Sequence, residues 1–132
     1  MPFLVGGDTS GERCVQRGGL AAGMSEKTIM QLKRDCGSVA SVDVEVVPFG
    51  EVLVQNGIKH VDALFIDMEG YEPEAIESID FERISVTALC IENNEEPRGA
   101  GRVRRLLESH GYRLVKSLNQ DDIYVSSRAK IW

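Results

Sequence analysis

The chain has 132 residues, of which 42% are hydrophobic and 27% are charged, a balance that is typical of one folded domain and excludes a disordered or fibrous chain. Its 21 acidic residues outnumber 15 basic ones and give a formal net charge of −6. Nucleic acid and anionic membranes both favour a basic surface, so we expect neither as a partner. No apolar run reaches the roughly 18 residues of a membrane span, and the N-terminus lacks the pattern of a signal peptide.

The three cysteines, Cys14, Cys36 and Cys90, cannot all pair within the chain and show no metal-ligand spacing. We therefore expect them to be buried or inert thiols. Free thiols are typical of a reducing compartment, so the expected location is the cytoplasm.

The predicted elements begin with a glycine-rich segment, residues 1–24, which we expect to be irregular apart from the end of a strand at residues 3–5. Ser25 is a favoured residue type at a helix N-cap, and Gly37 is the type at which helices end, so a helix is predicted between them. Alternating valines then predict a half-buried strand at residues 42–47.

A short helix is expected next, around residues 52–53, ending at the Asn56-Gly57 pair. A compact apolar run then predicts a buried parallel strand, and Pro73 favours the start of another helix. The strand covers residues 61–66, and the helix begins at residue 73. A second apolar strand follows at 84–91, then a helix at 98–110 and a closing pair of strands at 112–115 and 122–125.

Alternating strands and helices predict an α/β fold, with helices packed on the faces of one sheet over residues 25–132. The short connection between the last two strands implies one antiparallel strand near an edge.

Two of the apolar strands end in acids. The first is followed by Asp67 and Glu69, and the second ends at Glu92. Ligands of open α/β sheets bind beyond the carboxyl ends of strands, so these carboxylates would converge if the strands are neighbours. They could accept hydrogen bonds from a hydroxyl, act as a base or hold a hard cation. In the alternative reading, Asp67 and Glu92 only cap loops and helix N-termini, the role that we expect for Glu72 and Glu74.

The sequence of residues 66–72, IDMEGYE, resembles the "IDxEGxE" segment of the FkbM-type methyltransferases. Other stretches resemble further segments of that family in the same order, so the resemblance covers roughly residues 40–127. These stretches are VPFGEVL at 47–53, ALCIE at 88–92, LLESHGY at 106–112 and DDIYV at 121–125.

The resemblance implies a partial Rossmann-like sheet, mostly parallel, and an enzyme that transfers a methyl group from S-adenosylmethionine to a hydroxyl oxygen of a sugar or natural product. Asp67 and Glu69 would be catalytic, and Asp67 and Gly70 would lie at the cofactor. No metal is implied. The substrate-binding residues would be Glu92, Asn93 and Tyr71, although Tyr71 could equally cover the sheet.

The glycine-rich, cofactor-cradling half of such a domain is not visible, because residues 6–11 lack a strand–turn–helix context. We therefore expect the chain to be a truncated copy that corresponds to the C-terminal part of the domain. Its cofactor site would be incomplete, and whether it is active on its own is left open. The strand at residues 61–66 would then expose an apolar edge. Either the strand at 42–47 folds over it, or the chain self-associates or pairs with another chain there.

Two alternatives to a transferase remain open at this point. The first is a non-catalytic α/β fragment that acts as an association module. The second is a glycosidase-like hydrolase, which would need two of the strand-end carboxyls about 5–10 Å apart around a sugar-sized cleft.

Overall fold

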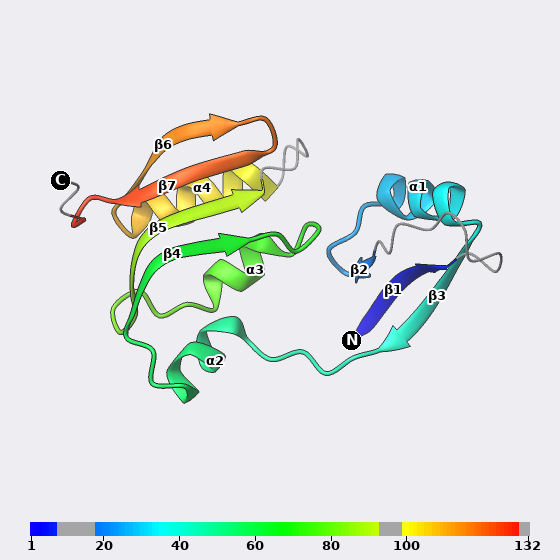
Figure 1. The fold of residues 1–132 in the computed structure, drawn as a ribbon, viewed down its shortest axis with the longest axis horizontal. Helices are drawn as coiled ribbons and strands as arrows, with labels where there is room; N and C mark the ends of the chain where they lie inside the picture. Colours follow the sequence, from blue (N-terminus) through cyan, green and yellow to red (C-terminus); the bar gives the residue numbers. More distant parts are fainter. Residues whose placement is uncertain (8–17, 93–98, 130–132) are drawn as a thin grey trace. The chain divides into compact units, whose positions relative to one another are not determined.

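The structure is a computed structural model that describes residues 1–7, 18–92 and 99–129. The chain divides into two units (Figure 1). Unit 1 consists of Met1–Val46 together with the tripeptide Glu69–Tyr71. Unit 2 consists of Val47–Met68 and Glu72–Trp132.

Unit 1 is built on a three-stranded antiparallel sheet in the order β2-β1-β3. Its strands are β1 (Pro2–Gly7), β2 (Gly18–Leu20) and β3 (Ser38–Asp43). The central strand pairs on both sides, so Phe3 lies opposite Leu20 in β2 and opposite Val42 in β3. The predicted strand end at residues 3–5 is therefore confirmed as part of β1, whereas Gly18–Leu20 is a strand where loop was expected.

The helix of unit 1, α1 (Glu26–Cys36), begins and ends as the sequence predicts. The Ser25 side chain accepts a hydrogen bond from the backbone N–H of Thr28 at 3.0 Å. This satisfies one of the amides that the first helical turn leaves without an intrahelical partner. Gly37 ends the helix with φ at 70°, a conformation that favours glycine.

The expectation of free thiols is wrong for one cysteine. Cys36, which is buried on α1, is disulfide-bonded, whereas Cys90 is a free thiol. Cys14 lies outside the described residues.

Unit 2 contains a four-stranded sheet in the order β4-β5-β7-β6. Strands β4 (His60–Ile66) and β5 (Ser85–Glu92) are parallel. Strand β7 (Asp121–Ser126) is antiparallel both to β5 and to the outer strand β6 (Tyr112–Leu118). β7 is therefore the antiparallel strand next to an edge that the sequence predicts.

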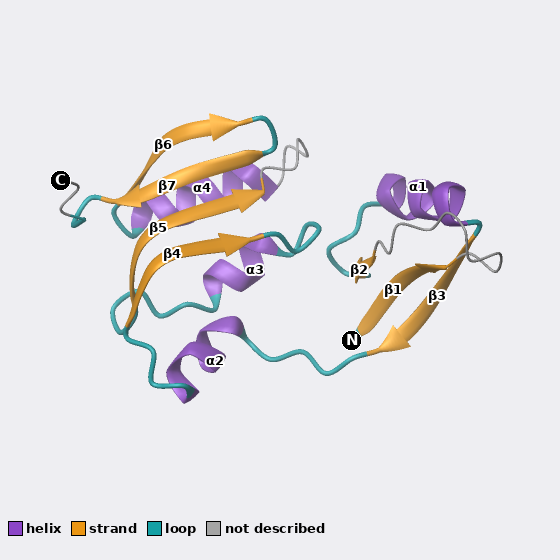
Figure 2. Ribbon diagram, viewed as in Figure 1, coloured by secondary structure: helices purple, strands orange, loops and turns teal. Residues whose placement is uncertain are grey.

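The helices of unit 2 are α2 (Phe49–Gln55), α3 (Glu72–Glu77) and α4 (Gly99–Ser109). Helices α3 and α4 lie on the same face of the sheet (Figure 2). Ala75 and Ile76 of α3, and Ile79 just after it, are all buried.

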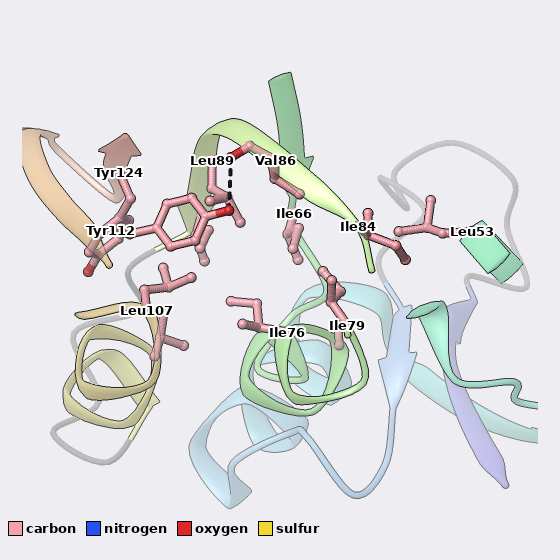
Figure 3. Close-up of a cluster of buried hydrophobic side chains, with 13 residues drawn as sticks. Leu53, Ile66, Ile76, Ile79, Ile84, Val86, Leu89, Leu107, Tyr112 and Tyr124 are labelled. Carbon is pink, nitrogen blue, oxygen red and sulfur yellow. Dashed lines mark hydrogen bonds between the residues drawn. The ribbon is translucent and has the colours of Figure 1, made fainter. Parts of the chain in front are cut away.

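The core of unit 2 lies between the sheet and these helices (Figure 3). Ile76 and Leu107, one from each helix, are completely buried, and Leu89 of β5 is 1% exposed. Burying a side chain of this kind contributes about 1.5–3 kcal/mol, so this layer is the main source of stability in the unit. The members of the cluster larger than alanine are Leu53, Ile66, Ile76, Ile79, Ile84, Val86, Leu89, Ile91, Val103, Leu107, Tyr112 and Tyr124.

Helices α3 and α4 are also joined by one arginine. Arg102 of α4 donates to Glu74 at 2.7 Å and, through Nε, to Glu77 at 2.8 Å. A second nitrogen of the same guanidinium, Nη2, also donates to Glu77, so the pair is bidentate. These hydrogen bonds raise the pKa of Arg102 further above its usual value.

Two predictions about strands are wrong in their details. The strand expected at residues 42–47 is formed instead by Ser38–Asp43, and it pairs with β1 rather than with β4. The strand β4, predicted from its apolar run to be buried, is largely exposed. Its place at the edge of the sheet agrees with the exposed apolar edge expected for a domain whose first half is not visible. Phe65 on this strand is 76% exposed.

Candidate functional site

Carboxylates gather at the carboxyl ends of the two parallel strands. Ile66 at the end of β4 is in register with Ile91 of β5, so the next residues, Asp67 and Glu92, also correspond. One carboxylate oxygen each from Asp67, Glu72 and Glu92 lies within 4.8 Å of the others. The parallel pairing therefore brings together the two strand-end acids that the sequence singles out.

The third acid of this group, Glu72, is only 4% exposed, whereas Asp67 is exposed and Glu92 is partly buried. Its Oε1 accepts a hydrogen bond from the backbone N–H of Met68 at 2.7 Å. Glu72 is also the first residue of α3, so its side chain closes the turn between β4 and that helix.

The backbone of this turn takes conformations that side chains rarely adopt. Glu69 has φ at 51° and Gly70 has φ at 98°. Within unit 1, a Cβ added to Gly70 would come within 2.4 Å of the carbonyl oxygen of Gly23. Both observations explain why glycine is needed at residue 70.

The acidic edge continues onto β7. Asp121 lies opposite Glu92, and the buried Asp122 lies opposite Ile91. Asp122 accepts hydrogen bonds from the hydroxyls of Ser117, at 2.5 Å, and Tyr124, at 3.5 Å. This carboxylate therefore has protein partners of its own.

Two other groups near this edge have perturbed pKa values. Burial, reinforced by the nearby Asp122 carboxylate, raises the pKa of Tyr124 to about 12. Burial, together with Asp121, raises the pKa of the Cys90 thiol. The thiolate is the nucleophilic form of cysteine, so the raised pKa of Cys90 favours a neutral, unreactive thiol.

Not all of the predicted site residues belong to unit 2. Glu69, Gly70 and Tyr71 belong to unit 1, where the Tyr71 hydroxyl lies 3.9 Å from the sulfur of Met1. Asn93 lies outside the described residues. Glu72, expected from its position only to cap a helix N-terminus, belongs to the carboxylate cluster. Its only sequence signal was its place as the last acid of the IDMEGYE segment.

A cluster of three carboxylates has a limited chemical repertoire. It can accept hydrogen bonds from hydroxyl groups, take up a proton and attract a positively charged group. All three ligands are oxygens, which is also the donor set that hard cations prefer. A parallel pair joined through a helix, with its acids beyond the strand ends, is an arrangement in which α/β proteins bind small molecules.

The arrangement is that of an α/β domain with an acidic site at the carboxyl edge of its sheet. The family model of the methyltransferase FkbM domain matches residues 11–114, and the chain belongs to this family. The match begins well before residue 40, where the resemblance described above begins, and it ends before β7. Neither a curated protein nor a solved structure was found to match the chain significantly. Among the described residues, no helix combines the length and apolar character needed to cross a membrane.

Methyltransferases commonly use S-adenosylmethionine, and the donor set at this edge fits one part of it. Carboxylates such as Asp67 accept hydrogen bonds from ribose hydroxyls and attract a positively charged sulfonium. Along the chain, β4 leads through residues 67–71 into α3, a strand–turn–helix order that nucleotide-binding motifs also use. This turn carries acids rather than a run of glycines, so it offers anionic groups and not an anion-binding cradle.

Proposed function

We propose that the chain transfers a methyl group from S-adenosylmethionine to a hydroxyl oxygen of a small molecule, a sugar or another natural product. The observation that carries this proposal is the convergence of Asp67, Glu72 and Glu92 at the carboxyl edge of β4 and β5. Membership of the FkbM family supplies the reaction class. The acceptor is expected to be neutral or cationic, because like charges at this edge would repel an anion.

The proposed roles follow from position and exposure. S-adenosylmethionine, when bound, supplies an electrophilic methyl group on a positively charged sulfur. The exposed Asp67 would accept the proton that the acceptor hydroxyl loses as its oxygen–carbon bond forms. The methyl–sulfur bond would break in the same transfer, and its electron pair would stay on the sulfur of the leaving S-adenosylhomocysteine. Glu92 accepts a hydrogen bond that orients the acceptor. Glu69, Gly70 and Tyr71 of the turn, together with Asn93, remain proposed contributors to the cofactor and substrate sites.

The experiment is a calorimetric titration of the full chain with S-adenosylmethionine and with S-adenosylhomocysteine. The proposal expects a Kd below about 1 mM, the affinity of a modest specific complex, and such binding would contradict the expectation from sequence that the cofactor site is incomplete. It also expects Asp67→Asn to lower methyl transfer while leaving cofactor affinity nearly unchanged. Asp62→Asn is the matched control, because Asp62 is an exposed acid on the same strand but lies near the amino end of β4, away from the carboxyl end where Asp67 follows. No binding, or full turnover by Asp67→Asn, would contradict the proposal.

A second candidate role is an association module, and the exposed edge strand favours it. The sheet order leaves the outer side of β4 without a strand partner among the described residues. Phe65 projects from this strand with 76% of its surface exposed. Unpaired edges with apolar side chains favour pairing with another chain, so we propose self-association or pairing with a further chain at β4. The hydrolase alternative is not favoured, because it leaves the family match unexplained.

The cytoplasm stays part of the proposal. The disulfide at Cys36 is the observation that weighs against it, because disulfides persist mainly in oxidising compartments. Thiol labelling of the denatured protein from freshly lysed cells would distinguish a reducing compartment such as the cytoplasm from an oxidising one. A labelled Cys36 supports the cytoplasm, and an unreactive, oxidised Cys36 contradicts it.

A further inference from the structure

We propose that Glu72 is a positioning residue that holds Asp67 in place for the transfer reaction, a role that rests on the proposed function. Glu72 is only 4% exposed, so a ligand has little access to it, and its carboxylate acts instead on the backbone of the site. It therefore differs from Asp67 and Glu92, whose carboxylates are more accessible.

The hydrogen bond of Glu72 acts on the peptide group next to Asp67. The N–H that donates to Glu72 Oε1, at 2.7 Å, is that of Met68. This N–H belongs to the peptide bond that joins Asp67 to Met68. A fixed acceptor at this distance restricts rotation of that peptide plane, and with it the direction in which the Asp67 side chain leaves the backbone.

The backbone after Met68 makes such a restraint necessary. Glu69 and Gly70 both have positive φ values, at 51° and 98°. A non-glycine residue in this region is strained and keeps its conformation only when surrounding contacts impose it. The Glu72 carboxylate closes the turn from its far side, and a charged acceptor makes a stronger hydrogen bond than a neutral one.

Glu72→Gln separates the hydrogen bond from the charge. A glutamine keeps an amide oxygen that can accept from the Met68 N–H, but it removes the negative charge beside Asp67 and Glu92. Glu72→Leu removes both while keeping a side chain of similar volume. If Glu72 positions Asp67, the glutamine variant resembles the wild type and the leucine variant does not.

The test uses the full chain and has two readouts that do not depend on turnover. These are the hydrogen-exchange rate of the Met68 amide and the carbon-13 chemical shift of the Asp67 carboxyl group. Glu72→Leu is expected to speed Met68 exchange by about tenfold or more, because a protected amide becomes exposed to solvent. It is also expected to shift the Asp67 resonance, whereas Glu72→Gln should preserve both signals. Glu74→Gln is the matched control on the same helix, since Glu74 pairs with Arg102 and should leave Met68 exchange unchanged.

Each outcome decides the inference. Unchanged exchange and an unchanged Asp67 signal in Glu72→Leu would overturn it, and so would a glutamine variant that behaves like the leucine variant. If Glu72→Leu does not fold, Glu72→Asp retains the charge but draws the acceptor away from Met68, and the same two readouts apply. Failure of the wild-type chain to bind S-adenosylmethionine contradicts the proposed function alone, because the Met68 and Asp67 signals are measured without cofactor.

Discussion

The hydroxyl of Tyr112 donates a hydrogen bond to the backbone oxygen of Val86 at 2.8 Å, which joins β6 to β5 although these two strands do not pair (Figure 3). The bond is buried, and both residues belong to the core of unit 2. It therefore ties the outer strand to the centre of the sheet.

Tyr112→Phe removes this bond and leaves the oxygen of Val86 without that donor. We expect the free energy of unfolding to fall by about 1–3 kcal/mol, the cost of leaving a buried polar group unsatisfied. Urea denaturation of the two proteins measures the difference. Tyr71→Phe is the control, because among the described residues the Tyr71 hydroxyl makes a long contact, 3.9 Å, with the Met1 sulfur, and its loss should cost under about 0.5 kcal/mol. Equal stabilities for wild type and Tyr112→Phe would show that the bond contributes nothing.

Alkaline pH should destabilise unit 2 through Tyr124. Its pKa is raised to about 12 in the folded chain from an ordinary value of 10, so the folded state disfavours the phenolate. The stability contributed by the neutral phenol is fully present below pH 10 and is lost as the pH rises from 10 towards 12. The thermal midpoint is expected to fall over this range, and the fall should be smaller in Tyr124→Phe. The same fall in both proteins would assign the effect to another group.

The Arg102 link between α3 and α4 predicts a small, salt-dependent contribution to stability. Arg102→Met removes two ion pairs whose side chains are 37–43% exposed, so the expected loss is at most about 1 kcal/mol. Thermal unfolding at low and high salt measures it, and the difference from wild type should shrink at high salt. The comparison variant is Arg104→Met, which breaks a single exposed pair with Glu108 within α4 and should cost less. A larger loss in Arg104→Met would contradict this ranking.

The β4 edge predicts association that a charge can prevent. Phe65→Lys places a positive charge on the exposed edge strand, where charged residues disfavour pairing with another chain. We expect wild type to show concentration-dependent sedimentation and Phe65→Lys to sediment as a monomer. Met30→Lys, on α1 of unit 1, is the control for simply removing an exposed apolar side chain, since Met30 is 62% exposed. A monomeric wild type at all concentrations would refute association at β4.

Local sequence patterns were sufficient to predict most of the elements. Ser25 and Gly37 define α1 because capping chemistry depends only on neighbouring residues. The same holds for the apolar runs that form β4 and β5. The position of β3 was not predictable, because the valines at 42–47 fit a strand equally well, and the pairing with β1 decided the outcome.

The candidate site was predictable to the extent that strand order was. Asp67 and Glu92 each follow an apolar strand, so a parallel pairing was enough to bring them together. Glu72 could not be assigned from sequence, because its burial and its bond to Met68 depend on the path of the turn. The apolar run of β4 by itself predicts a buried strand, because such a run does not reveal how many neighbours the strand has. Its exposed edge was expected only because the first half of the domain was not visible in the sequence.

The position of β7 has a consequence for synthesis of the chain. This strand comes last among the elements, yet it separates β5 from β6 in the sheet. A ribosome therefore has to translate Asp121–Ser126 before β5 gains its second neighbour, and the central hydrogen-bonded ladder can form only after α4 and β6 have been translated. A nonsense mutation shortly before this segment would remove an interior strand, not a dispensable tail.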